Sequence, residues 1–475
     1  MPPDYDLFAV NSGTITAPAG CGKTQLITDT LALHVGPKPI LILTHTNAGV
    51  SALRNRLQRA RVRHSAYRVT TIDGFAMHLV GTFPRRSALD PEVLKLNNPK
   101  TDYNAIRTSA SILLQAGHLL DVLTSTYCRL IVDEYQDCLL SQHAIVAWLA
   151  TSLPTCVLGD PMQAIFGFRG NQLVNWEADV LRQFPSVGEL AVPWRWRNAQ
   201  AEQLGHWLLA CRQTLAAGGG IDLRIAPPEV AWVQLRPGAA DVQRIEAART
   251  VAPNRDGSVL IIGDSQKVSG RRRMASQTPG AINVEPADLR DLTDFGQRFS
   301  PEAPDAVDQL VTFAAETMTN VGAAELQRRV ASLSKGTARN PPNPVEQALL
   351  DFANVPNLSK AMDALIQIQH GPGVRVYRPE ILRSCVAAMQ RATQEYCSFH
   401  EATERERERR RHLGRPIARR AVGSTLLLKG LEADVAVILH PESMDAKHLY
   451  VALTRGARRV VVCSATPNLT PIVTS

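Results

Sequence analysis

The chain has 475 residues, 45% hydrophobic and 20% charged, a balance typical of a folded globular protein and not of a disordered one. Its formal net charge of +8 favours a polyanionic partner, nucleic acid before membrane. The eight cysteines form no C-x-x-C pair, which argues against zinc sites and iron–sulfur clusters. No apolar run reaches the roughly 18 residues of a membrane span, and no apolar stretch marks a signal peptide. We therefore expect a cytoplasmic protein with reduced thiols and no membrane partner.

Short apolar runs alternate with longer helical patterns up to about residue 190. Such alternation predicts a parallel sheet with helices on both faces. The expected strands of this first sheet are 15–17, 39–44, 68–72, 129–133 and 155–159.

A second set of apolar runs predicts a second α/β sheet, with strands at 189–192, 258–262, 434–439 and 459–463. Each sheet is interrupted by sequence with helical patterns and few strand signals. The predicted fold class is therefore α/β, with two parallel-sheet domains that each carry a mostly helical insertion. The expected boundaries are 1–79 and 126–190 for the first sheet domain, 80–125 for its small helical insertion, 191–267 and 416–475 for the second sheet domain, and 268–415 for its helical insertion.

The stretch TAPAGCGKTQ, residues 16–25, follows a strand pattern and precedes a helical one. It is close to the pattern G-x-x-x-x-G-K-[ST], with Ala17 at the first glycine position. In such a loop the backbone N–H groups of a helix N-terminus surround phosphate, the lysine reaches the β- and γ-phosphates, and the hydroxyl binds Mg²⁺. The sequence therefore predicts a nucleotide site that uses ATP and Mg²⁺. Its expected residues are Ala19, Gly20, Cys21, Gly22, Lys23, Thr24 and Gln25.

The second motif is LIVDEYQD, residues 130–137. Asp133 ends an apolar strand and suits Mg²⁺, as does Thr24 of the loop. Glu134 beside it can orient or deprotonate an attacking water. Acidic pairs after strands are also common loop residues, but an acid pair downstream of a phosphate loop favours an ATPase.

The third motif is GDPMQAIFGFRG, residues 159–170, which again follows a buried strand. Polar residues there emerge at the sheet edge where a ligand is expected. Gln163 is placed to sense a γ-phosphate or a water. Phe166 and Phe168 are either core residues or flat faces on which bases stack, each stack contributing about 1–3 kcal/mol. Because they stand among glycines and an arginine, stacking is the preferred interpretation.

These three motifs resemble the Walker A, Walker B and third motifs of superfamily 1 helicases of the UvrD/Rep/PcrA type, whose Walker A also starts with alanine. The resemblance implies two RecA-like domains with ATP bound between them. It implies an ATP-dependent single-stranded DNA translocase or helicase that moves 3′ to 5′. Further stretches resemble the family's motifs Ia, at 43–48 (LTHTNA), and Ib, at 71–75 (TIDGF). The residues expected to contact DNA are His45, Thr46, Asn47, Thr71, Phe75, Phe166, Phe168, Arg169 and Trp194.

The later family motifs also occur in order. LAVPWRWR, residues 190–197, resembles motif IV, which brings an arginine to the γ-phosphate; the spacing favours Arg195, with Arg197 as the alternative. STLLLKGLE, residues 424–432, is similar to motif V, which implies a nucleotide contact by Gly430 and Glu432 near the ribose. YVALTRG, residues 450–456, resembles motif VI, whose arginine finger would be Arg455.

Two other interpretations compete with the helicase. One is an accessory ATPase that works with a nuclease or another protein partner, as in antiphage systems of the Gabija kind. The other is a nucleic-acid-binding scaffold that has lost hydrolysis. The residues Lys23, Glu134, Gln163 and Arg455 argue against the scaffold, because each belongs to the machinery of hydrolysis in the family.

Overall fold

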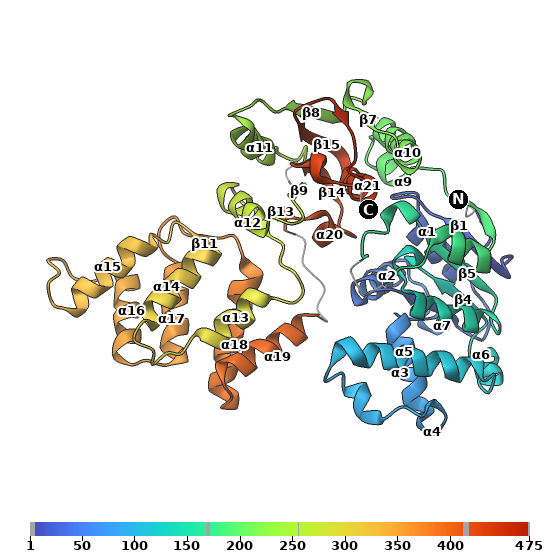
Figure 1. The fold of residues 1–475 in the computed structure, drawn as a ribbon, viewed down its shortest axis with the longest axis horizontal. Helices are drawn as coiled ribbons and strands as arrows, with labels where there is room; N and C mark the ends of the chain where they lie inside the picture. Colours follow the sequence, from blue (N-terminus) through green and yellow to red (C-terminus); the bar gives the residue numbers. More distant parts are fainter. Residues whose placement is uncertain (1–4, 168–171, 255, 412–417, 474–475) are drawn as a thin grey trace. The chain divides into compact units, whose positions relative to one another are not determined.

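The structure of the protein is a computed structural model that describes residues 5–167, 172–254, 256–411 and 418–473 (Figure 1). The chain forms two compact units. The first unit contains Met1–Val230, Met444–Arg458 and Asn468–Ser475, and the second contains Ala231–Ser443 and Arg459–Pro467. The six-part domain assignment made from the sequence stays a prediction, and each unit is described by itself below.

The first unit is built on a six-stranded parallel sheet with the order β3-β2-β4-β5-β1-β6. The strands are β1 Ser12–Thr16, β2 Ile40–Thr44, β3 Tyr67–Thr71, β4 Arg129–Val132, β5 Thr155–Gly159 and β6 Ser186–Glu189. The central strands β2, β4 and β5 are buried along their whole length, as expected when helices cover both faces of a parallel sheet. The five strands expected in this sheet are confirmed.

Alternate residues of one strand serve the two faces of this sheet. Ile40 and Ile42 of β2 pack with the helices α1 and α2, whereas Leu41 and Leu43 pack with α3, α5 and α7. This division follows from the period of two along a strand. The helices of the first unit that cover the sheet are α1 Lys23–Leu33, α2 Asn47–Arg59, α3 Ile72–Thr82, α7 Leu140–Ala150 and α8 Leu181–Gln183.

The short insertion after α3 packs directly on one face of the first sheet. It contains α4 Pro84–Ser87, α5 Pro99–Gln115 and α6 Leu120–Thr126. Ile106 and Ala110 of α5 are fully buried and share one core with Val146 of α7. The guanidinium of Arg107 also donates from Nε to Oδ1 of Asp73 at 2.6 Å, which fixes α5 to α3. The insertion is helical, as expected.

One expected strand was wrong. The apolar run at 189–192 was predicted to open the second sheet, but β6 belongs to the first sheet, where it pairs in parallel with β1. The N–H of Leu190 donates to the carbonyl of Thr16 at 2.9 Å and extends this pairing. Because β6 is an edge strand with mostly exposed residues, its sequence lacks the continuous apolar run that marks a buried strand.

The second unit contains another six-stranded sheet with the order β10-β13-β9-β14-β15-β8, in which β10, β13, β9 and β14 are parallel. The strands are β8 Val230–Gln234, β9 Val259–Ile262, β10 Ile282–Asn283, β13 Arg420–Gly423, β14 Ala433–Ile438 and β15 Gly456–Ser464. The helices α11 Ala240–Ala248 and α12 Val268–Gln277 and the short α20 Thr425–Leu428 accompany it. The strands β10 and β13 were not predicted because they are short. The strand β8, with the sequence VAWVQ, was missed although its apolar run was a usable signal.

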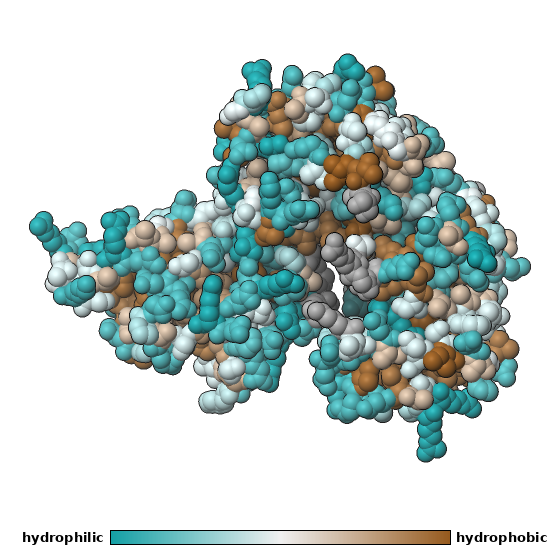
Figure 2. Space-filling model, in the orientation of Figure 1, coloured by the Kyte–Doolittle hydropathy of each residue, from teal (hydrophilic) through white to brown (hydrophobic). Residues whose placement is uncertain are grey.

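The rest of the second unit is a helical body with a core of its own, and its visible face is mostly hydrophilic (Figure 2). It contains α13 Arg290–Arg298, α14 Ala306–Thr317, α15 Ala323–Ser334, α16 Pro344–Asn354, α17 Leu358–Gln369, α18 Pro379–Glu395, α19 Phe399–Arg411 and an antiparallel pair of short strands, β11 Met318–Thr319 and β12 Arg375–Val376. The rings of Phe295 and Phe313 stack in this core with centroids 4.2 Å apart. In this structure the helical insertion begins only after β10, because Ala275 of α12 packs in the core of the second sheet.

Three further helices complete the first unit: α9 Trp194–Asn198, α10 Glu202–Ala216 and α21 Ala446–Leu453. Two short antiparallel strands, β7 Ile221–Asp222 and β16 Asn468–Leu469, join the end of the chain to the segment after α10. Across the described part of the chain, no helix is both long and apolar enough to cross a bilayer.

Candidate functional site

The loop between β1 and α1 has the backbone of a phosphate loop. Gly20 and Gly22 have φ angles of 70° and 90°, which lie in the left-handed region that favours glycine. A Cβ atom on Gly20 would lie 2.6 Å from the ring of Trp196, so both conformation and space require glycine there. Ala17 continues the sheet, since its N–H donates to the carbonyl of Gly159 at 2.8 Å. This ordinary strand geometry explains why alanine can replace the first glycine of the pattern.

The N-terminus of α1 is suited to an anion. Among the residues that the structure describes, no side chain caps this end of the helix, and its first turn contains no acidic residue. The first N–H groups of a helix have no partner within the helix, and the helix dipole favours negative charge at that end. A phosphate group would satisfy both needs.

Lys23 lies at this helix end between two carboxylates from the end of β4. Its Nζ is 2.8 Å from Oδ1 of Asp133 and also forms an ion pair with Oε1 of Glu134. Burial opposes the charge of Lys23, but the two carboxylates outweigh burial and raise the pKa of Lys23. Burial also raises the pKa of Asp133, against the stabilising charge of Lys23. Glu134 has a φ of 56° and its N–H donates to Asp133 at 2.9 Å.

This set of side chains fits a nucleoside triphosphate with Mg²⁺. A lysine and free helical N–H groups suit phosphate oxygens, whereas a hydroxyl and a carboxylate, from Thr24 and Asp133, are the hard oxygen ligands that Mg²⁺ takes. Among the described residues no cluster of three or more His, Cys, Asp or Glu side chains could hold a metal ion. With one hydroxyl and one carboxylate from the protein, the remaining ligands of Mg²⁺ would be phosphate oxygens and water.

Cys21 and Gln25 complete the predicted loop residues. Cys21 is 1% exposed, and burial raises the pKa of its thiol to about 12, so the thiol stays protonated. Gln25 is exposed and points along the surface, where its side chain bonds to Asp29 and Arg56. Neither side chain therefore takes part in the ion-pair cluster of Lys23.

The segment after β5 places Gln163 beside a buried aspartate. Gln163 Nε2 donates to Oδ2 of Asp160 at 3.0 Å, and Arg212 of α10 donates from Nε to Oδ1 of the same carboxylate at 3.0 Å. Burial opposes the charge of Arg212, but Asp160 outweighs it and raises the pKa of Arg212. Sequence reasoning missed Arg212. The available signal was that Arg212 shares the face of α10 that also carries the buried Leu208 and Leu215.

The helix α9 packs against the phosphate loop and carries both candidate arginines, which occupy different surroundings. The N–H of Arg195 donates to the carbonyl of Gly20 at 3.0 Å, and its Nη1 donates to the carbonyl of Thr454 at 2.8 Å. Arg197 instead is exposed, where it pairs with Glu202 at 2.6 Å. The structure therefore brings Arg195, not Arg197, to the loop.

Trp194 lies beside the last glycine of the phosphate loop. A Cβ atom on Gly22 would lie 2.9 Å from Cδ1 of its indole ring. The guanidinium of Arg197 lies over the same ring, 5.2 Å from its centroid. In this structure Trp194 lies against Gly22, before the start of α1, and the DNA contact expected of it stays a prediction.

The helix α21 also reaches the phosphate loop, within the same compact unit. The N–H of Ala19 donates to the hydroxyl of Tyr450 at 3.1 Å. Arg455 follows the end of this helix and is 3% exposed. Its guanidinium donates from Nε to the carbonyl of Val451 at 2.8 Å and from Nη2 to Oγ1 of Thr454 at 3.1 Å. Arg195 and Arg455 therefore meet at Thr454.

The predicted DNA-contacting residues of the first unit divide into two groups. Thr46 and Thr71 cap α2 and α3, where they accept bonds from Gly49 and Gly74. The rings of His45 and Phe166 lie 5.9 Å apart, after β2 and β5, and Asn47 is exposed at the start of α2. These residues lie at the carboxyl edge of the sheet, where ligands bind in such folds.

The prediction for Phe75 needs correction. Its ring is 3% exposed and packs in the core between α3 and the first sheet, so it offers no face for a base. Phe168 and Arg169 lie outside the described residues. Gly430, with a φ of 81°, and the exposed Glu432 belong to the second unit, and their nucleotide contacts stay a prediction.

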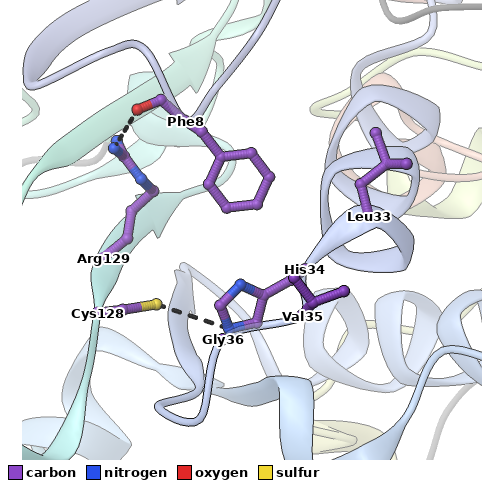
Figure 3. A pocket seen from close by; sticks show the side chains of 7 residues that line it. All are labelled: Phe8, Leu33, His34, Val35, Gly36, Cys128 and Arg129. Carbon is purple, nitrogen blue, oxygen red and sulfur yellow. Dashed lines mark hydrogen bonds between the residues drawn. The ribbon is translucent and has the colours of Figure 1, made fainter.

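A separate hollow of about 370 Å³ lies at the other end of α1 (Figure 3). Its lining residues are Phe8, Leu33, His34, Val35, Gly36, Cys128 and Arg129. Arg129 donates to the carbonyl of Phe8 at 2.6 Å, and His34 bonds to the carbonyl of Lys38 at 2.7 Å. The side chains of Arg129 and His34 in this hollow thus bond to carbonyl groups of the protein's own backbone.

The sheet order, the loop and the acid pair after β4 define a P-loop protein with a RecA-like sheet, accompanied by a second α/β sheet domain. Residues 9–102 and 92–179 match the model of the UvrD/REP helicase N-terminal domain. Residues 9–179 are thus similar to the N-terminal domain of UvrD/REP helicases, which confirms the resemblance that the motifs predicted.

Individual relatives are more distant. The chain is 30% identical over 126 residues to a probable DNA helicase of Mycoplasma pneumoniae. That match covers 26% of this chain and 24% of the relative, so the chain spans less than a quarter of that protein. Two solved structures, each 14% identical to this chain, are also similar to it. They are the Arterivirus nonstructural protein 10 helicase with DNA (TM-score 0.28, covering 53% of this chain and 48% of that one) and the Pif1 helicase of Candida albicans (TM-score 0.27, covering 52% and 53%).

Proposed function

We propose that this protein is an ATP-driven motor that hydrolyses ATP with Mg²⁺ at the Lys23 loop and moves along single-stranded DNA. The observation that carries the proposal is the cluster of Lys23, Asp133 and Glu134 at an uncapped helix N-terminus. A cation for phosphate, a carboxylate for Mg²⁺ and a carboxylate for water stand together there, which is the set that phosphoryl transfer to water requires.

Each side chain has a role in this proposal. Lys23 and Thr24 hold the phosphates and Mg²⁺, and Glu134 takes the proton of the attacking water. Bound ATP supplies the phosphoryl group that is transferred. Gln163 orients the water or senses the γ-phosphate, while Arg195 and Arg455 stabilise the negative charge that develops on the transferred group. For Arg455 this role requires its guanidinium to exchange the bonds to Val451 and Thr454 for phosphate.

Single-stranded DNA is the proposed track. The net charge of +8 favours a polyanion, and the rings of His45 and Phe166 lie together at the carboxyl edge of the first sheet. Aromatic rings bind single strands by stacking on bases, without regard to sequence. The 3′ to 5′ direction rests on the family resemblance alone.

The test is steady-state ATP hydrolysis by the full chain with and without single-stranded DNA. We expect DNA to stimulate turnover and Glu134→Gln to lower kcat about 10²- to 10⁴-fold, as for loss of a general base. Glu177→Gln, at an exposed position of the same unit, is the control and should keep wild-type turnover. Turnover that ignores DNA would favour an accessory ATPase with a protein partner, and absent turnover would favour a scaffold.

Strand displacement on tailed duplexes tests the direction. A duplex with a 3′ single-stranded tail should be unwound with ATP, and one with a 5′ tail should not. Unwinding of the 5′-tailed duplex alone would contradict the proposed direction while leaving the ATPase intact.

A further inference from the structure

Gln136 connects two motifs of the site through one buried side chain. It lies in the 3₁₀ turn Tyr135–Asp137 after β4 and is 1% exposed. Its Nε2 donates to Oε2 of Glu134 at 2.6 Å, and its Oε1 accepts a bond from the N–H of Asp160 at 3.0 Å. A single amide thus contacts the proposed base and the first residue after β5.

The Glu134 carboxylate is held from two sides. Lys23 contacts Oε1 and Gln136 contacts Oε2, so each oxygen has its own cationic or N–H partner. The backbone of Glu134 is in the left-handed region, with φ 56°, a conformation that persists when the surrounding contacts require it. A carboxylate held in this way has little freedom to rotate.

The fit of Gln136 against β5 is tight. A Cβ atom on Gly159 would lie 2.5 Å from Oε1 of Gln136, so glycine at the last position of β5 is what allows the amide to approach. Asp160, the next residue, accepts bonds from Gln163 and Arg212 through its carboxylate. The segment held by Gln136 is therefore the one that carries Gln163 and, three residues further on, Phe166.

We propose that Gln136 is a positioning residue that orients Glu134 for proton abstraction and makes that orientation depend on the segment after β5. The inference rests on the proposed hydrolysis at Glu134. It adds that binding of a nucleic-acid strand near Phe166 changes turnover through Asp160 and Gln136. A glutamine with only a structural role would affect folding and leave the ratio of stimulated to basal turnover unchanged.

The variants separate the two bonds of the amide. Gln136→Leu removes both. Gln136→Glu keeps an acceptor for the N–H of Asp160 but presents an oxygen to Glu134 in place of the N–H donor. Gln136→His keeps one donor and one acceptor. Gln142→Leu is the matched control, because Gln142 is equally buried and its side chain accepts a bond from the N–H of Leu139, at the start of α7.

The readouts are kcat, the KM for ATP and the stimulation of kcat by a single-stranded oligonucleotide, all on the full chain with folding checked by thermal melting. Loss of a hydrogen bond to a charged group corresponds to about 10- to 100-fold. We therefore expect kcat to fall by that factor in Gln136→Leu and at least as far in Gln136→Glu, with KM within about threefold of wild type. Stimulation of kcat by the oligonucleotide should be lost in Gln136→Leu and in Gln136→Glu. Gln136→His should retain a higher kcat and more stimulation than Gln136→Leu.

The outcomes are distinct. A wild type that hydrolyses ATP, together with folded Gln136 variants of unchanged kcat and stimulation, would overturn the inference and leave the proposed function standing. Equal losses in Gln136→Leu and in the control Gln142→Leu would also overturn it, because the effect would then be one of stability. A wild type without any turnover would overturn the proposed function and the inference together.

Discussion

The hydroxyl of Tyr450 accepts a hydrogen bond from the N–H of Ala19 at 3.1 Å, across 431 residues of sequence. Both residues are buried, with exposures of 1% and 5%. Burial raises the pKa of Tyr450 well above its usual value, so the hydroxyl is protonated over the physiological range. A helix near the end of the chain thus supplies a partner for an N–H group of the phosphate loop.

Replacing Tyr450 by Phe removes this partner and leaves the Ala19 N–H buried without it. In the absence of nucleotide, we expect the free energy of unfolding to fall by about 1 kcal/mol. The loss should shrink with a non-hydrolysable ATP analogue and Mg²⁺, since phosphate then accepts the same N–H. Tyr67→Phe, at the start of β3, removes a hydroxyl bonded to His64 and should lose the same stability with and without the analogue. A Tyr450→Phe loss that the analogue does not change would contradict the account.

The two arginines of α9 give a second prediction. Arg195→Ala should lower kcat/KM for ATP by about 10³-fold or more, as for removal of an arginine that stabilises phosphoryl transfer. Arg197→Ala should stay near wild type, because an exposed ion pair such as that with Glu202 contributes about 0–1 kcal/mol. Steady-state kinetics on both variants show which arginine contributes to hydrolysis. A larger loss of kcat/KM in Arg197→Ala than in Arg195→Ala would contradict the choice of Arg195.

The cap of α21, the helix that carries Tyr450 and ends before Arg455, gives a prediction about stability and pH. Asp445 accepts bonds from the N–H and the Nδ1 of His448. Burial alone would raise the pKa of Asp445, but the bonds from His448 outweigh it and lower the pKa. The stability that charged Asp445 contributes is therefore fully present above the ordinary aspartate pKa near 4, and is lost as pH falls through the lowered value.

Asp445→Ala should accordingly reduce the free energy of unfolding by about 1 kcal/mol at neutral pH, and the difference from wild type should narrow as pH falls below about 4. Denaturant unfolding at several pH values measures this. Asn357→Ala removes a neutral cap that accepts the Lys360 N–H on α17. Asn357→Ala should lower the free energy of unfolding by a similar amount at every pH tested. If the Asp445→Ala difference from wild type did not change with pH either, the charged cap at Asp445 would be contradicted.

The aromatic pair at the sheet edge gives a fourth prediction. Phe166→Ala should weaken binding of single-stranded DNA about 10- to 100-fold, the equivalent of one lost stacking contact. Phe75→Leu should leave this affinity unchanged and lower stability instead, because Phe75 is in the core. Fluorescence anisotropy with a labelled oligonucleotide measures both. Equal weakening in the two variants would mean that stacking on Phe166 is not the cause.

Much of the first unit was predictable from local sequence. The strand β2, ILILT, is buried throughout, so a short apolar run marked it unambiguously. The phosphate loop was predictable because its chemistry requires glycines and a lysine at fixed spacing, and Gly20 and Gly22 have the left-handed φ angles that this spacing implies. The acid pair at Asp133 and Glu134 followed from its place at the end of a buried strand.

Other features depend on contacts that no local pattern contains. Arg212 bonds to Asp160 across 52 residues and Gln136 reaches Asp160 across 24, so neither partner was visible from spacing. The edge strand β6 was not assigned to the first sheet, because exposed strands lack an apolar run. Phe75 was misassigned although a signal existed: Ile72, Phe75 and Leu79 recur at helical spacing and form the buried face of α3.

The most direct measurement is the affinity of the full chain for a non-hydrolysable ATP analogue with Mg²⁺, compared between wild type and Lys23→Ala. Removing Lys23 takes away a cation for phosphate and leaves the carboxylates of Asp133 and Glu134 to repel it, so the Kd should rise about 100-fold or more. Lys95→Ala, at an exposed lysine paired with Glu92, should bind as wild type does. A Kd for Lys23→Ala equal to that of wild type would contradict the account.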